Sequence, residues 1–145
     1  PVLEIKRKQG LLGTKESAPL QPFTLDEHFS SGQAQALLRG SKLPDTMRRE
    51  LDHVEPTLMN HYRRQYFRSA DRQVRITIDS NLGFSRFRRH RNSFLDRIAT
   101  PRLVVMEVKY AGEASSRVSS IAHSFPFRMT RMSKYVLGLD LIGGR

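Results

Sequence analysis

A glutamate and a lysine stand two residues apart in the segment RLVVMEVKYAG, residues 102–112. In the period-two alternation of a β-strand, Glu107 and Lys109 lie on one face and Met106 and Val108 on the other. A carboxylate on such a face can bind a hard divalent cation, and an ammonium group can bind an anion. The solvated face of an ordinary sheet has the same pattern, so this segment alone does not distinguish a site from a surface.

Two further segments have the same alternation. The chain opens with VLEIKR, in which Glu4 and Lys6 are again two residues apart. The segment VRITID places Arg75, Thr77 and Asp79 together on one face. Three strands with matching polar faces favour an antiparallel β tunnel or barrel with a polar lumen and flanking helices. A basic lumen of this kind would hold a strongly anionic ligand.

Turn and cap signals define the elements that would position these side chains. Thr24 and Glu27 form a capping box, which predicts a helix over residues 25–39, and Pro44 and Asp45 begin a second, short helix. Residues 11–15 would return as a strand beside residues 2–7. Residues 58–68 predict a strand that a turn joins to residues 74–79 as an antiparallel hairpin. Residues 118–125 predict a further helix, so the expected fold class is α+β.

The composition favours an anionic partner. Of 145 residues, 25 are Lys or Arg and 14 are Asp or Glu, which gives a formal net charge of +11. Nineteen of the basic residues are Arg, whose planar group suits bidentate contacts to phosphate. Phosphate chains, nucleotides, nucleic acid and an acidic membrane surface all fit this charge. The chain has no cysteine, which excludes disulfides and thiolate metal sites.

The length suits one domain with a hydrophobic core, so we expect residues 1–145 to form a single domain. No apolar run approaches the roughly 20 residues of a membrane-spanning helix, and no charged and apolar leader is present. We therefore expect a soluble, cytoplasmic protein. The chain begins at Pro1 within a predicted strand, which indicates an N-terminally incomplete copy of its domain.

An arginine-rich segment at residues 84–102 suggests a different function. Phe84, Phe87 and Phe94 alternate there with arginines, as on surfaces that stack against nucleic-acid bases. In the other interpretation, the phenylalanines pack beneath the sheet while the arginines face water. We favour the second interpretation and keep an arginine-rich nucleic-acid-binding domain as an alternative.

Six short motifs occur in the order EIKRK, TKES, YRRQYF, VRITID, MEVKY and SKY. Together they resemble the vacuolar transporter chaperone (VTC) domain, a polyphosphate polymerase domain of the triphosphate tunnel (CYTH-like) family. The resemblance covers nearly the whole chain, which would correspond to the C-terminal portion of the family domain. It implies transfer of the terminal phosphate of ATP onto a polyphosphate chain, with a divalent metal, manganese or magnesium, completing the site. A triphosphatase, or a module that binds nucleotide or polyphosphate, is the alternative within the same fold.

The resemblance also implies roles for individual residues. Those expected to bind the triphosphate are Lys6, Lys15, Tyr62, Arg64, Arg75, Lys109, Ser133 and Lys134. Among them, Arg64, Arg75 and Lys134 are expected to be catalytic, and Glu107 is expected to bind the metal. Phosphoryl transfer needs positioning and electrostatic stabilisation rather than a protein nucleophile, which fits a chain without cysteine.

Two departures from the family pattern concern the phosphate ligands. Two residues after Lys15 the chain has Ser17, where the family has an arginine. The opening strands of the family have no counterpart in these residues. The expected partners are a nucleoside triphosphate and polyphosphate. We expect no specific nucleic acid as a partner and no membrane segment in the chain.

Overall fold

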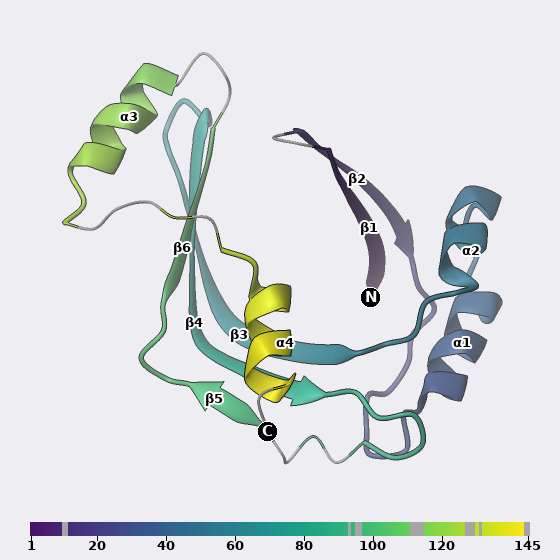
Figure 1. Ribbon diagram of the computed structural model, residues 1–145. Coiled ribbons are helices and arrows are strands. Elements are labelled where there is room, and N and C mark those ends of the chain that lie inside the picture. Colours follow the sequence, from purple (N-terminus) through teal and green to yellow (C-terminus); the bar gives the residue numbers. More distant parts are fainter. Residues whose placement is uncertain are drawn as a thin grey trace. The chain divides into compact units, whose positions relative to one another are not determined.

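The computed structural model describes residues 1–9, 12–92, 94, 97–110, 115–126, 130 and 132–143. The elements in chain order are β1 (Val2–Gln9), β2 (Leu12–Pro19), α1 (Ser31–Gly40), α2 (Asp45–Leu51), β3 (Leu58–Arg68), β4 (Val74–Arg86), β5 (Ile98–Thr100), β6 (Val105–Tyr110), α3 (Ser115–His123) and α4 (Lys134–Gly143). The described strands form a two-stranded and a four-stranded antiparallel sheet (Figure 1). The fold class is α+β, as predicted. No helix within the described ranges is long and apolar enough to cross a membrane.

The chain divides into two compact units. Unit 1 contains Pro1–Thr57 and Arg86–Asp96, and unit 2 contains Leu58–Ser85 and Arg97–Arg145. Each unit has its own sheet and its own helices.

The β1–β2 hairpin of unit 1 has one apolar and one polar face. Leu3 and Ile5 pack with Ala18 against Met47 of α2, which is fully buried. The other face contains Glu4, Lys6 and Lys15, with Lys6 directly opposite Lys15 in the antiparallel register. The predicted alternation of β1 is confirmed. Strand β2 continues to Pro19, beyond the predicted residues 11–15, of which residue 11 lies outside the described residues.

Helix α1 begins later than the sequence predicted. Its capping box consists of Ser30 and Gln33, each of which accepts a hydrogen bond from the backbone N–H of the other, at 3.3 and 2.8 Å respectively. The predicted box at residues 24–27 is wrong. Asp26 there accepts a hydrogen bond from the N–H of His28 at 2.9 Å, and such a local turn competes with a helix start. Helix α2 begins at Asp45, as predicted.

The phenylalanines of the arginine-rich segment pack inward. Phe84 of unit 2 is fully buried. In unit 1, Phe87 meets Phe29 edge-on with ring centroids 6.0 Å apart and lies 6.4 Å from the ring of Phe94. Residues 93, 95 and 96 of the segment lie outside the described residues. Because these rings are engaged in packing, the structure favours the interpretation in which they do not stack on bases.

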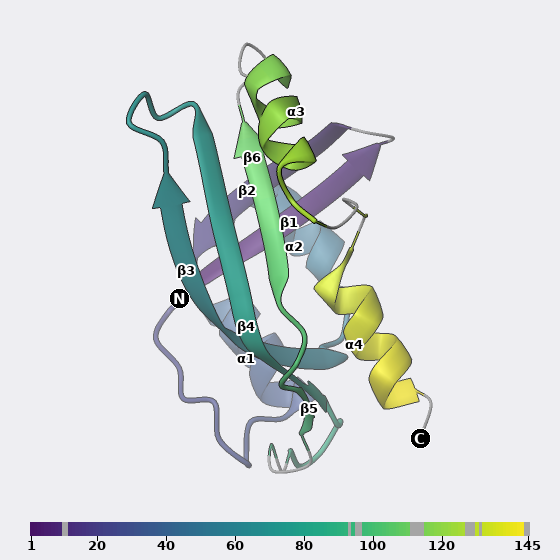
Figure 2. The same cartoon turned by 90° about the vertical axis from the view of Figure 1, so that its left-hand side faces the viewer.

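Strand β4 is the central strand of unit 2, as Figure 2 shows with the sheet nearly face-on. Its first half, Val74–Asp79, pairs with β6, and Leu82–Phe84 pairs with β5. Strand β3 has the predicted bounds, whereas β4 extends seven residues beyond the predicted end at Asp79, to Arg86. Strand β6 lies within the predicted residues 102–112, of which 111 and 112 are outside the described residues.

The alternation of β4 is interrupted at Asn81, which has a positive φ of 54°. Val105 lies opposite Asp79, yet it packs in the same cluster as Leu82 and Phe84. Asp79, Leu82 and Phe84 therefore share a face, although strict alternation would separate them. One extra residue in a strand, as in a β-bulge, has this effect.

The two helices of unit 2 cover opposite faces of its sheet (Figure 1). Val118 of α3 packs on Val74 and Ile76, with Val108 beside them. Helix α4 packs on the face that contains Leu82 and Phe84, through residues that include Leu137, Leu141 and Ile142. One face of β4 is thus polar in its first half and apolar in its second half, where α4 lies.

Candidate functional site

The carboxylate of Asp79 lies at the centre of a polar cluster in unit 2. Its side chain is 1% exposed. Arg64 donates from Nε to Oδ1 at 2.6 Å and from Nη2 to Oδ2 at 2.7 Å, and Nζ of Lys134 lies 2.6 Å from Oδ2. The paired bonds from Arg64 are the fork geometry that a guanidinium favours with a carboxylate. One buried anion therefore holds two cations, and with Tyr62 these residues form what we call the Asp79 cluster.

Tyr62 gives both cations a second contact. Its ring centroid lies 4.9 Å from the guanidinium carbon of Arg64 and 5.1 Å from Nζ of Lys134. The ring of Tyr66 lies 5.8 Å from the same carbon of Arg64. These distances fall within the range of cation–π interactions. The aromatic rings and the carboxylate together fix where the two cations lie.

The ions of the cluster shift each other's proton affinity. The hydrogen bonds from Arg64 hold the pKa of Asp79 below its usual value, although burial acts in the opposite direction, and Lys134 lowers it further. The bond to Asp79 in turn raises the pKa of Arg64. Asp79 and Arg64 therefore stay ionised at neutral pH, so adding the ammonium of Lys134 leaves the cluster with one excess positive charge.

Helix α4 positions Lys134 through its N-terminus and its packing. The hydroxyl of Ser133 caps the helix by accepting a hydrogen bond from the N–H of Val136 at 3.4 Å. A lysine in the first turn is unfavourable because that end of a helix has a partial positive charge, and Asp79 offsets this cost. Gly138 lets the helix lie close to the sheet, since a Cβ there would be 2.6 Å from side-chain atoms of Leu58 and Phe84.

Towards the β3–β4 turn, the same face becomes more basic. Arg75 lies opposite Lys109, and both line a cavity of about 340 Å³ together with Arg68 and Arg72 of the turn region. Arg72 belongs to the turn. Without it, the strands and α4 provide five cations on this face, Arg64 and Lys134 included, together with the carboxylates of Asp79 and Glu107. We call this set the basic face: Arg64, Arg68, Arg75, Lys109, Lys134, Asp79 and Glu107.

Glu107 lies between the two ends of the basic face. It is opposite Thr77, whose hydroxyl is buried and has no hydrogen-bond partner within the described part of the chain. Glu107 is half exposed, and its Oε1 lies 3.3 Å from Nζ of Lys109. The pairing within the E-x-K motif is therefore present, and the carboxylate still has access to solvent.

The donor set of unit 2 fits a divalent cation only together with oxygens of a ligand. The described residues contain no group of three or more His, Cys, Asp or Glu side chains that could hold a metal ion. Asp79 is occupied by Arg64 and Lys134, which leaves Glu107 as the exposed carboxylate of the face. Magnesium is commonly bound through one or two carboxylates plus phosphate oxygens. Glu107 fits the expected metal ligand in that arrangement.

The lysines expected on the first strand pair converge on one glutamate in unit 1. Nζ of Lys15 lies 2.8 Å from Oε1 of Glu4, and Nζ of Lys6 lies 3.2 Å from Oε2. Hydrogen bonds from these two lysines hold the pKa of Glu4 below its usual value. All three side chains are solvent-accessible, with Glu4 35% exposed and Lys15 55% exposed. These lysines belong to a different unit from the Asp79 cluster.

The structure brings several of the expected site residues together. Tyr62, Arg64 and Lys134 meet in one cluster, Arg75 and Lys109 are cross-strand partners, and Ser133 caps the helix that begins with Lys134. Sequence reasoning placed Asp79 on the polar face but gave it no role. The signal was present, because Asp79 is the only acid in VRITID and follows a strand rich in arginine.

Comparisons with known proteins agree with these observations. No curated protein and no solved structure gives a significant match to the chain. The family model described as the VTC domain matches residues 1–142. VTC domains have the triphosphate tunnel-like fold, which is the resemblance that the six motifs indicated. The match extends over nearly all of the 145 residues, and the chain therefore belongs to the VTC domain family.

Proposed function

We propose that this domain is a phosphotransferase of the polyphosphate polymerase type, which moves the terminal phosphate of ATP onto the end of a polyphosphate chain. The supporting observation is the basic face, in which five cations accompany two carboxylates. Such a face suits a substrate with several adjacent negative charges. Membership of the VTC family is consistent with this activity.

Arg64 and Lys134 are the residues that we expect to bind the transferred phosphate. Asp79 occupies two N–H donors of Arg64 and one of Lys134, and each side chain has further donors. Arg64 and Lys134 are 26% and 18% exposed, so a ligand can reach them. Donors that are already fixed in place stabilise developing charge without reorganisation. Arg75 and Lys109 would bind the neighbouring phosphates.

The proposed reaction needs no protein nucleophile. A terminal oxygen of polyphosphate attacks the γ-phosphorus of ATP, and the bond from that phosphorus to the β–γ bridging oxygen breaks, so that ADP leaves with the electron pair. The attacking oxygen is already anionic and requires no base. A manganese or magnesium ion held by Glu107 and phosphate oxygens would supply charge neutralisation. Lys6 and Lys15 remain proposed phosphate ligands because of the family resemblance.

The products distinguish this activity from its alternatives. The full-length protein, incubated with ATP and Mn²⁺, should form ADP and long, acid-precipitable polyphosphate, with one phosphate residue incorporated for each ADP released. Release of orthophosphate alone would identify a triphosphatase, and binding of ATP without turnover would identify a binding module; either result contradicts the proposal. Arg75→Gln should lower turnover, whereas Arg49→Gln, an equal charge change on the exposed face of α2, should not.

A further inference from the structure

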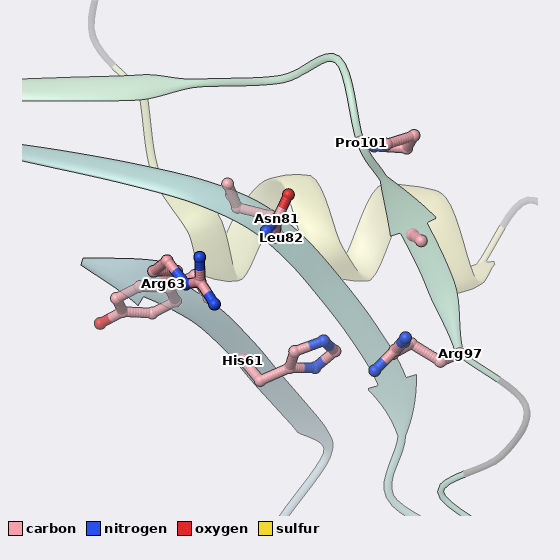
Figure 3. A pocket seen from close by; sticks show the side chains of 8 residues that line it. His61, Arg63, Asn81, Leu82, Arg97 and Pro101 are labelled. Atoms are coloured by element: carbon pink, nitrogen blue, oxygen red, sulfur yellow. The ribbon is translucent and has the colours of Figure 1, made fainter. Parts of the chain in front are cut away.

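A hollow of about 620 Å³ lies on the face of the unit 2 sheet opposite the Asp79 cluster. His61 and Arg63 line it from β3, where they alternate with Tyr62 and Arg64. Arg97 and Pro101 line it from the ends of β5, and Asn81 and Leu82 from β4 (Figure 3). We call this feature the His61 hollow. Tyr62 of the Asp79 cluster is also among its lining residues, but the charged side chain of Arg63 alternates along β3 with that of Arg64 and so lies on the other side of the sheet from the basic face.

His61 and Arg97, two of the lining residues, pack over the backbone of Gly83 in β4. A Cβ at this position would lie 2.1 Å from Cε1 of His61 and 2.8 Å from Cδ of Arg97. The imidazole ring and the stem of the arginine therefore both rest on β4, and they point toward one another (Figure 3). Only glycine leaves room for this arrangement, so the sequence holds the two side chains together over the strand.

No described acidic side chain offsets the positive charge in the hollow. No acidic side chain is among the described residues that line it, and neither Arg63 nor Arg97 has an ion pair within the described parts of the chain. Burial, and then the charge of Arg97, lower the pKa of His61. An imidazole and two guanidinium groups in one place repel further positive charge and attract an anion.

We propose that the His61 hollow is a second anion site, which binds a phosphate group through Arg63, Arg97 and the imidazole of His61. Guanidinium groups present paired N–H donors that match phosphate oxygens, and the side-chain amide of Asn81 adds a neutral donor. The phosphate is either free in solution or the end of a polyphosphate chain. This site shares none of its ligands with the proposed phosphotransferase site and does not depend on that proposal.

The imidazole of His61 reports directly on occupancy. In the full-length protein with labelled histidine, NMR titration with orthophosphate and with tripolyphosphate should produce a saturable shift of the His61 ring signals. The other four histidines of the chain serve as internal controls. Arg97→Gln and Arg63→Gln should each weaken this response by about tenfold or more, because each removes a charge-assisted contact. Arg49→Gln should leave it unchanged.

Two results would overturn the proposal: no saturable response of His61, or the same affinity after either substitution in the hollow. Both arginines are exposed, so we expect the variants to fold. Without ligand, their melting temperatures should hold or rise, since each variant removes a like charge.

The pH dependence of anion affinity tests whether the imidazole of His61 contributes to binding. Sulfate is the suitable probe, because its charge is constant between about pH 5 and 8, the range in which histidine titrates. Its affinity should rise as the pH falls through the pKa of His61, since protonation adds a charge that faces the anion. Among the described residues that line the hollow, the charged groups beside His61 are Arg63 of β3 and Arg97 before β5. His61→Gln should flatten the profile, and a flat profile before substitution would contradict the proposal.

Two further arms identify the source of the phosphate and separate the two sites. If the natural ligand is a chain, tripolyphosphate should bind the hollow more than tenfold more tightly than orthophosphate; equal affinities would indicate free phosphate.

Lys134→Met, on the basic face, should leave the response of His61 unchanged. If ATP turnover is absent while the response of His61 persists, only the proposed activity has failed. A loss of the His61 response in Lys134→Met would merge the two sites and overturn the separate hollow.

Discussion

Within the described residues, a carboxylate in each unit lies between two Lys or Arg side chains, and the two arrangements differ in burial. In unit 1, Glu4 pairs with Lys6 and Lys15, and all three are open to water. In unit 2, Asp79 pairs with Arg64 and Lys134, and the carboxylate is almost completely buried. Exposed ion pairs contribute little to stability because water and salt screen them. Breaking a buried pair leaves an unpaired charge where water cannot solvate it. The same charge ratio therefore forms a buried cluster in one unit and a solvent-screened one in the other.

The largest expected effect is on stability, at the buried carboxylate. Asp79→Asn keeps the size of the side chain but leaves Arg64 and Lys134 without their anion, so we expect a loss of about 3–5 kcal/mol in the free energy of unfolding. Urea denaturation measures this loss. Glu4→Gln is the matched control in unit 1 and should shift the urea midpoint little. Equal losses in the two variants would show that burial does not distinguish the clusters.

Glu107 tests whether an exposed carboxylate can matter for chemistry and not for stability. Glu107→Gln removes the charge proposed to hold a divalent cation, so turnover of ATP should fall by about 10²-fold or more. Stability should change by only about 0–1 kcal/mol, because the pair with Lys109 is exposed. Manganese titration of both forms decides the role, and an unchanged manganese dependence in the variant would remove Glu107 from the mechanism.

Lowering the pH should reduce the difference in stability between the unmodified protein and Asp79→Asn. The pKa of Asp79 is lowered in the folded protein, so its stabilising effect is complete above the unfolded pKa of about 3.9 and is lost as the pH falls through the folded pKa. The difference in unfolding free energy between the unmodified protein and Asp79→Asn should therefore shrink below about pH 4. Each tenfold change in proton affinity corresponds to about 1.4 kcal/mol. A constant difference down to the acid transition would mean that Asp79 stabilises the fold by its shape.

Salt should give the smallest effect and, of the Glu4 and Asp79 clusters, should affect only that of Glu4. Ionic screening at about 1 M salt acts within roughly 3 Å in water, so the contacts of Glu4 should lose their remaining attraction. The already small difference between Glu4→Gln and the unmodified protein should disappear. The effect of Asp79→Asn should persist, because water and ions do not reach that carboxylate. A strong salt dependence of the Asp79→Asn effect would argue that the cluster opens in solution.

The strands were predictable because alternation is a local property. Residues 58–68 and the polar face of VRITID were placed correctly from sequence, and the lysines of the first strand pair fall on one face as expected. The start of α1 was missed because two capping signals lie six residues apart, and the turn at Asp26 makes the first one unusable. Phe29, just before the cap that is used, also packs with Ala34 and Leu37 of the helix.

Helix α4 and the Asp79 cluster depend on contacts that no local pattern shows. The segment YVLGLDLIG has a glycine in its interior, which disfavours a helix by propensity, and Gly138 is tolerated because α4 must approach Leu58 and Phe84. Lys134 lies 55 positions after Asp79 in the chain, so their meeting is a tertiary event. The residue types of the site were readable from sequence, and the carboxylate that organises them was not.

The irregular residue Asn81 also constrains how this chain can vary in length. Leu82 and Phe84 face α4 only because one additional position in β4 precedes them. Deleting Asn81 would place Leu82 two positions after Asp79, so strict alternation would keep both side chains on the α4 side. Regular pairing with Asn81 retained would instead turn them to the side of His61, and α4 would lose its apolar support. We therefore expect relatives without the irregular residue to have one residue fewer between Asp79 and Leu82, and relatives that keep it to have Asn, Asp or Gly at this positive-φ position.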